Sequence, residues 1–186
     1  MTWLGYHQAM NEDLANFKAW FADVLTTLYP NRDAGIAVLT LSLPLAERYV
    51  RQKNKAGPEG ALTDDCMTSL IAILPALRHI ATARQFWAVY RHGFLHQATL
   101  SAVARGGASL PIGWLTHDTA EPFEIRPDGS FQVHPVLLSQ EIVRAIEADF
   151  AVFAGTVAGA PPLARVSRLD PVTIPSGYVG TGNPPV

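Results

Sequence analysis

The sequence contains a single cysteine, Cys66, among its 186 residues. One cysteine can form neither an intramolecular disulfide nor a thiolate cage around a metal ion, so both kinds of cross-link are excluded. Disulfides are typical of oxidising compartments, and their absence favours a reducing one. We therefore expect a cytoplasmic protein without a thiolate-bound structural metal.

Charge is also scarce. Charged residues make up 16% of the chain, against about a quarter in ordinary soluble domains, and the formal net charge is −2. A protein that coats nucleic acid non-specifically needs clustered lysine and arginine, so this class is excluded, whereas a small site for one or two phosphates is not. A surface with few charges is typical of a surface partly covered in an assembly, and we expect a homodimer.

Long apolar runs are absent. No uncharged apolar stretch reaches the roughly 18 residues that a membrane-spanning helix needs. Residues 1–7 lack a basic segment followed by a long apolar run, which is the pattern of a signal peptide. We expect neither a membrane span nor a secretion signal.

Apolar residues recur at helical spacing through most of the chain and predict an all-α fold. The expected helices cover residues 11–28, 33–54, 63–80, 82–100 and 136–153. Pro44 lies inside the second of them and is expected to kink or split it, because its ring clashes with the preceding helical turn.

The third helix has a clear start. Thr63 is expected to cap it, and Asp64 and Asp65 suit the positive end of the helix dipole in the first turn. Paired aspartates can also indicate a metal site, but hard cations want several oxygen ligands and no third carboxylate is near in sequence. Capping accounts for both aspartates without a metal.

Short extended runs interrupt the helical pattern between residues 112 and 134. The turn-forming residues 126–130 separate two of these runs and predict a β-hairpin. Beyond residue 155, glycine and proline recur without an apolar core. We therefore predict a domain at 1–155, a bundle of four to five helices with a small β-hairpin at about 112–134 before the last helix, followed by an extended tail at 156–186.

The stretch 82–100 holds the candidate site. At 100° per residue its apolar residues share one side, which is expected to be buried: Ala83, Phe86, Trp87, Tyr90, Phe94 and Ala98. His92 and His96 lie together on the other side, and Arg91 lies at the border. A guanidinium and two imidazoles beside a buried stripe make this the best candidate for a functional site.

The string Tyr90-Arg-His-Gly-Phe-Leu-His96 resembles the Arg-x4-His signature of the HEPN (higher eukaryotes and prokaryotes nucleotide-binding) superfamily. The resemblance implies a helical, commonly dimeric protein, and many members are metal-independent endoribonucleases. It assigns His96 as acid/base, Arg91 as the phosphate clamp and His92 as an orienting polar residue. It also implies no cofactor, RNA or a nucleotide as ligand, and a toxin or defence role in which an antitoxin would be a protein partner.

The chemistry of these residue types agrees with that assignment. Histidine transfers protons near neutral pH, and the planar fork of arginine pairs with two phosphate oxygens. However, positions 91 and 96 lie about 140° apart around an ideal α-helix and do not share a stripe. A site formed where two copies face each other would remove this difficulty, which makes the dimer part of the expected mechanism.

Other interpretations remain open. His92 and His96 could be ordinary polar-face residues with Arg91 paired to a carboxylate, and a non-catalytic HEPN-like module that binds a nucleotide, RNA or a protein is the main alternative to an enzyme. Two histidines alone are too few ligands for zinc. The sequence contains no Gly-x-Ser-x-Gly motif, so this signature of a serine hydrolase is absent.

One basic cluster stands at the end of the second predicted helix: Arg48, Arg51, Lys53 and Lys55. Cations at a helix C-terminus stabilise its dipole, which is a purely structural role. A phosphate-facing rim beside the candidate site is the functional alternative.

Overall fold

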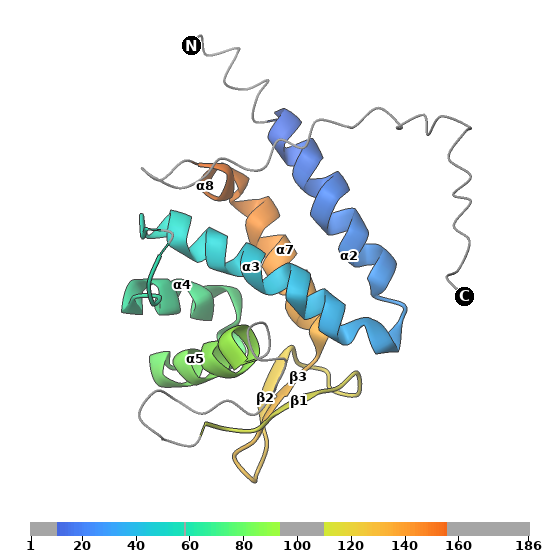
Figure 1. The fold of residues 1–186 in the computed structure, drawn as a ribbon, viewed down its shortest axis with the longest axis vertical. Coiled ribbons are helices and arrows are strands. Elements are labelled where there is room, and N and C mark those ends of the chain that lie inside the picture. The colour runs from blue at the N-terminus through green and yellow to red at the C-terminus, as the bar shows by residue number, and fades with distance from the viewer. Residues whose placement is uncertain (1–10, 58, 94–109, 156–186) are drawn as a thin grey trace, which may run out of the picture.

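The computed structural model describes residues 11–57, 59–93 and 110–155, in which helices predominate and a small sheet lies at one end (Figure 1). The described residues are mostly helical, which agrees with the predicted all-α class in its coarser form, and they also contain a three-stranded sheet. The predicted tail at 156–186 and residues 94–100 of the predicted helix 82–100, which include Phe94, His96 and Ala98, lie outside the described residues. None of the described helices is both long and apolar enough to cross a membrane.

The first helix is continuous in the chain but changes its winding. Residues 11–17 are α-helical, the π-helical segment η1 covers Lys18–Ala22, and α2 covers Asp23–Leu28. The remaining helical elements follow in chain order: η2 (Arg32–Ala34), α3 (Gly35–Lys53), α4 (Asp64–Ile73), η3 (Pro75–Leu77), α5 (Ile80–Phe86), η4 (Trp87–Gly93), α7 (Pro135–Ala148) and α8 (Phe150–Ala154).

The long helix α3 is the centre of the molecule and packs against α2, α4, α7 and α8. It runs without a break through Pro44, so the predicted split is wrong. Pro44 lies on an exposed position, while its neighbours Leu43 and Leu45 are buried. Burial of the flanking turns against several helices outweighs the hydrogen bond that proline removes.

The third predicted helix starts as expected but ends early. Thr63 Oγ1 accepts a hydrogen bond from the amide of Cys66 (3.3 Å), which confirms the cap. The helix ends at Ile73 instead of continuing to residue 80. Leu74 leaves the helical region because it precedes Pro75, a position where the proline ring disfavours helical backbone angles.

Three short strands form one sheet in the order β1-β3-β2. They are β1 (Gly113–Leu115), β2 (Phe123–Ile125) and β3 (Phe131–Val133). The predicted hairpin is confirmed, since β2 and β3 are antiparallel and Arg126 and Ser130 close the turn through a backbone hydrogen bond of 2.9 Å. The parallel pairing of β1 with β3 was not predicted.

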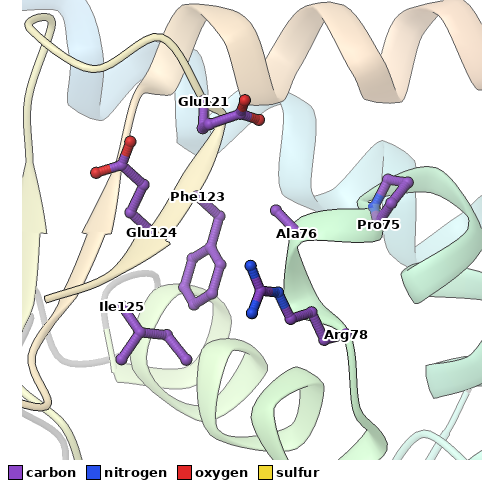
Figure 2. Close-up of a pocket in the computed structure, with 7 residues that line it drawn as sticks. All are labelled: Pro75, Ala76, Arg78, Glu121, Phe123, Glu124 and Ile125. Carbon is purple, nitrogen blue, oxygen red and sulfur yellow. The ribbon is translucent and has the colours of Figure 1, made fainter.

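Strand β2 lies at one edge of this sheet. Between it and η3 is a hollow of about 530 Å³, lined by all three residues of β2 together with Glu121, Pro75, Ala76 and Arg78 (Figure 2). The hollow lies beside the strand edge and separates the sheet from the turn that leads into α5.

Candidate functional site

The helical segment that carries the predicted site is fixed to the core by its apolar face. Ala83, Phe86, Trp87 and Tyr90 are all buried, as predicted. The hydroxyl of Tyr90 accepts the amide N–H of Trp114 (3.1 Å) and lies 3.0 Å from the carbonyl of Phe131. Burial raises the pKa of the Tyr90 phenol well above its usual value, so it stays a neutral hydrogen-bonding group.

The winding of this segment differs from the prediction. Residues Trp87–Gly93 form the π-helical segment η4, whose hydrogen bonds join residue i to residue i+5. Residues five apart in such a helix lie nearly above one another, as residues four apart do in an α-helix. Segments of this kind occur frequently at functional sites. Segment η4 ends at Gly93, so this winding includes position 91, while position 96 lies outside the described residues.

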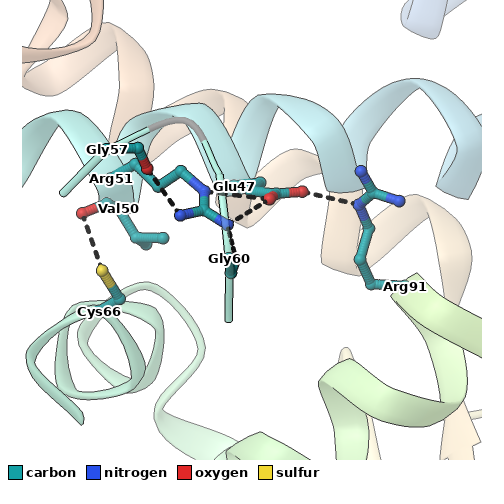
Figure 3. Close-up of polar contacts among 7 residues, drawn as sticks. All are labelled: Glu47, Val50, Arg51, Gly57, Gly60, Cys66 and Arg91. Atoms are coloured by element: carbon teal, nitrogen blue, oxygen red, sulfur yellow. Dashed lines mark hydrogen bonds and ion pairs between the residues drawn. The ribbon is translucent and has the colours of Figure 1, made fainter. Parts of the chain in front are cut away.

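Arg91 is half-buried and contacts a carboxylate from another helix. Its Nε lies 2.9 Å from Oε2 of Glu47 on α3, and the side chains of Arg91 and Glu47 are 18% and 19% exposed (Figure 3). Such a pair is sheltered from water but still reaches the surface. The predicted alternative in which Arg91 pairs with a carboxylate is thus seen in the structure.

The same carboxylate binds a second arginine. Oε1 of Glu47 accepts hydrogen bonds from Nε (3.0 Å) and Nη2 (2.9 Å) of Arg51, one turn further along α3 (Figure 3). We call Glu47, Arg51 and Arg91 the Glu47 network. Each carboxylate oxygen serves one guanidinium, and with one anion for two cations the network carries a formal charge of +1.

Arg51 also holds the loop after α3. Its Nη1 donates to the carbonyl of Gly57 (2.8 Å), and its Nη2 donates to the carbonyl of Gly60 (2.6 Å). The Glu47 network therefore joins three parts of the chain: the end of α3, the following loop and η4.

The other cations of the predicted basic cluster are used differently. Arg48 Nε donates to the carbonyl of Phe153 (3.2 Å), and its guanidinium lies over the Phe153 ring. Lys53 lies 3.9 Å from a carboxylate oxygen of Asp149. These intramolecular contacts favour the structural interpretation of the cluster. Of its four cations, all within the described part of the chain, only the exposed Lys55 makes no side-chain hydrogen bond or ion pair.

Of the two histidines in the predicted site, one lies within the described residues and the other does not. His92 is exposed on η4, directly after Arg91. His96 lies outside the described residues, so its distance from Arg91 is not part of this structure. Within the described part of the chain, no three His, Cys, Asp or Glu side chains are placed to hold a metal ion.

Sequence reasoning missed Glu47 as the partner of Arg91. The sequence does indicate one part of this network. Glu47 and Arg51 are four residues apart with the acid first, which is the favourable order for an ion pair on a helix. No short sequence pattern connects that pair with Arg91, which lies 44 residues after Glu47.

Comparison with protein-family models, characterised proteins and solved structures found no match for this chain.

Proposed function

We propose that the chain is a metal-independent endoribonuclease of the HEPN type, built on a bundle of four to five helices and active as a homodimer. The observation that carries the proposal is the placement of Arg91 and His92 in adjacent positions of a π-helical segment, with the Arg91 guanidinium held near the surface by Glu47.

In this proposal, His96 removes the proton from a ribose 2′-hydroxyl. The 2′-oxygen attacks the neighbouring phosphorus, the bond to the 5′-oxygen breaks, and the protonated imidazole returns the proton to that oxygen. The products are a 2′,3′-cyclic phosphate and a 5′-hydroxyl. Arg91 stabilises the charge that grows on the phosphoryl oxygens, and His92 orients the phosphate.

Glu47 has a positioning role in this scheme. A guanidinium carries five N–H donors in a rigid plane, so a contact at Nε sets the direction in which the rest of the fork points. A preoriented arginine loses less conformational entropy when it binds a phosphate.

The experiment is an RNA cleavage assay in EDTA with the wild type and the variants His96→Ala and Arg91→Lys. We expect cleavage by the wild type and a loss of about 100-fold or more in His96→Ala, the range of general acid–base catalysis. Arg91→Lys keeps the charge but not the fork and should also lose activity while remaining folded.

The exposed His79 supplies the matched control, because it precedes α5 and lies outside the proposed site. His79→Ala should cleave like the wild type. Undiminished cleavage by His96→Ala would overturn the mechanism.

A second candidate is a non-catalytic helical module that binds a nucleotide, RNA or a protein. The observation that favours it is the Glu47 network itself, in which Arg91 joins η4 to α3 as a structural group. This candidate is supported if labelled RNA binds without being cut and Arg91→Lys leaves that binding unchanged.

A further inference from the structure

Arg78 has a backbone conformation that residues with a side chain rarely adopt. Its φ is 60° and its ψ is −47°, and the amide of His79 bonds to the carbonyl of Leu77 across it (2.6 Å). This is the γ-turn of the rarer hand, which is strained. Glycine is the usual residue at a positive φ because it has no Cβ to clash. The chain therefore carries an arginine where glycine would be more favourable for folding.

The packing on both sides of Arg78 imposes this conformation. Leu77 is fully buried at the end of η3, and the chain returns to the core in α5, where Ala83 and Phe86 are buried. The reversal between these buried elements includes the strained turn at Arg78. Strain of this kind persists where the surroundings impose it, and it is concentrated at binding and active sites. We therefore expect the Arg78 side chain to have a use that outweighs its strain.

The Arg78 side chain lines the hollow of about 530 Å³ beside β2. Figure 2 shows its guanidinium on the side of the Phe123 ring. Within the described part of the chain, this guanidinium is exposed and makes neither a hydrogen bond nor an ion pair. A guanidinium presents its N–H donors in one plane, and a carboxylate can accept two of them side by side. The hollow thus offers a donor group suited to a carboxylate.

Much of the remaining lining is apolar. Pro75 and Ala76 contribute from η3, and Phe123 and Ile125 contribute from β2. The Phe123 side chain is 2% exposed and that of Ile125 is 53% exposed, so the lining includes an exposed aliphatic group beside a buried ring. Because η3 packs against β2, the hollow suits a small molecule rather than a further strand. Small-molecule clefts have volumes in this range and combine apolar walls with a few polar groups.

Two carboxylates restrict the charge of such a molecule. Glu121 and Glu124 also belong to the lining, and Figure 2 shows their carboxylates away from the Arg78 guanidinium. A monoanion gains the contact with Arg78. The second charge of a dianion such as phosphate would find no further cation in the lining and would be repelled by both carboxylates. The charges therefore favour a single carboxylate over a phosphate.

We propose that this hollow binds a small organic monocarboxylate with an apolar body. The carboxylate pairs with the Arg78 guanidinium, and the apolar body packs against Ala76, Phe123 and Ile125. Such a ligand covers the exposed Ile125 side chain and gives the strained arginine its use. This inference does not depend on the proposed nuclease.

The probe is phenylpropionate, titrated into the isotope-labelled full chain while NMR follows the backbone amide shifts. We expect saturable shifts at Arg78, His79 and Ile125, with a dissociation constant on the order of 1 mM. Phenylpropionamide has the same shape without the charge, and acetate has the charge without the ring. Each should bind at least about tenfold more weakly. Lack of saturation by phenylpropionate, or equal binding of the amide or of inorganic phosphate, contradicts the proposal.

The variant Arg78→Gly separates binding from folding. Glycine adopts this φ without strain, so we expect the thermal unfolding midpoint to rise by about 2–4 °C while phenylpropionate binding is lost. The matched control is Lys55→Gly, because Lys55 is the other non-glycine residue with a positive φ (51°) in the described chain and does not line the hollow. It should gain stability and keep binding. Equal binding by the two variants, whether retained or lost, would overturn the proposal.

Discussion

Glu47 pairs with two arginines at once, the buried Arg51 and the half-buried Arg91. The Glu47 side chain is 19% exposed, that of Arg51 is 11% exposed and that of Arg91 is 18% exposed. Removing the anion would leave two guanidiniums in reach of each other with little water to screen them. This makes the carboxylate more important for stability than any exposed ion pair of the molecule.

We therefore expect Glu47→Gln to lower the free energy of unfolding by about 3 kcal/mol, the lower end for breaking a buried pair. The measurement is urea unfolding at neutral pH. The matched control is Glu141→Gln, whose partner Arg144 is 69% exposed, and its loss should be about 0.5 kcal/mol. Equal losses in the two variants would show that the Glu47 network is not a stability element.

A histidine caps the last long helix. Nδ1 of His134 accepts the amide N–H of Leu137 (3.3 Å), and the ring of His117 lies 5.1 Å from the His134 ring. Burial, followed by the charge of His117, lowers the pKa of His134, while Asp118 opposes this to a smaller extent. Protonation at Nδ1 would also remove the acceptor that the cap requires.

Stability should consequently depend on pH. Because the pKa of His134 is lower in the folded than in the unfolded protein, the unfolded state binds more protons between the two values. The stabilisation is present above about pH 6.5 and is lost as the pH falls through the folded pKa. We expect a smaller free energy of unfolding at about pH 5.5 than at about pH 7.5, and a flatter profile for His134→Asn, which keeps a capping oxygen. An unchanged profile in that variant would assign the pH dependence to other groups.

At the scale of elements, the contact between η4 and the sheet fixes the direction of the candidate site. Tyr90 bonds to β1, and Gly113 lets that strand approach the helix. A Cβ at Gly113 would lie 2.7 Å from Cγ1 of Val89 and 3.1 Å from Oη of Tyr90. Only glycine fits there without displacing the helix or the strand.

Gly113→Ala is accordingly expected to lower the free energy of unfolding by about 1–3 kcal/mol, the usual effect of overpacking a core. Gly57→Ala is the control, because a Cβ at that position meets nothing within 4 Å. Thermal unfolding of both variants checks the expectation. A Gly113→Ala protein as stable as the control would mean that η4 and β1 are less closely packed than described.

The elements that sequence reasoning found are those set by local signals. Apolar spacing located the helices, Thr63 marked the start of α4, and residues 126–130 marked the hairpin turn. Features set by tertiary packing were missed or misjudged: the unbroken helix through Pro44, the parallel pairing of β1 and the π winding of η4. Packing against neighbouring elements decides each of these, and no short sequence pattern encodes it.

The candidate site divides in the same way. Its residue types and the buried face behind Arg91 could be predicted, because both follow from helical spacing. The contact with Glu47 could not, because it joins two helices that are distant in the sequence. The hollow beside β2 and the turn at Arg78 were also missed, since they depend on the order of the strands and on a single backbone angle.

At the scale of the whole molecule, the proposed homodimer makes a distinct prediction. If each site takes Arg91 from one subunit and His96 from the other, mixed dimers of Arg91→Ala and His96→Ala contain one intact site. Random mixing of the two inactive variants should then restore about a quarter of the wild-type cleavage rate. No recovery in mixtures that do exchange subunits would place both groups of a site in one chain.

The ribonuclease proposal is tested most directly by the chemistry of the RNA ends after incubation with the wild-type protein in EDTA. Mass spectrometry of the fragments should show 2′,3′-cyclic phosphates paired with 5′-hydroxyls, and His96→Ala should produce neither. Intact RNA under all conditions, or fragments that end in a 3′-hydroxyl and a 5′-phosphate, would contradict it.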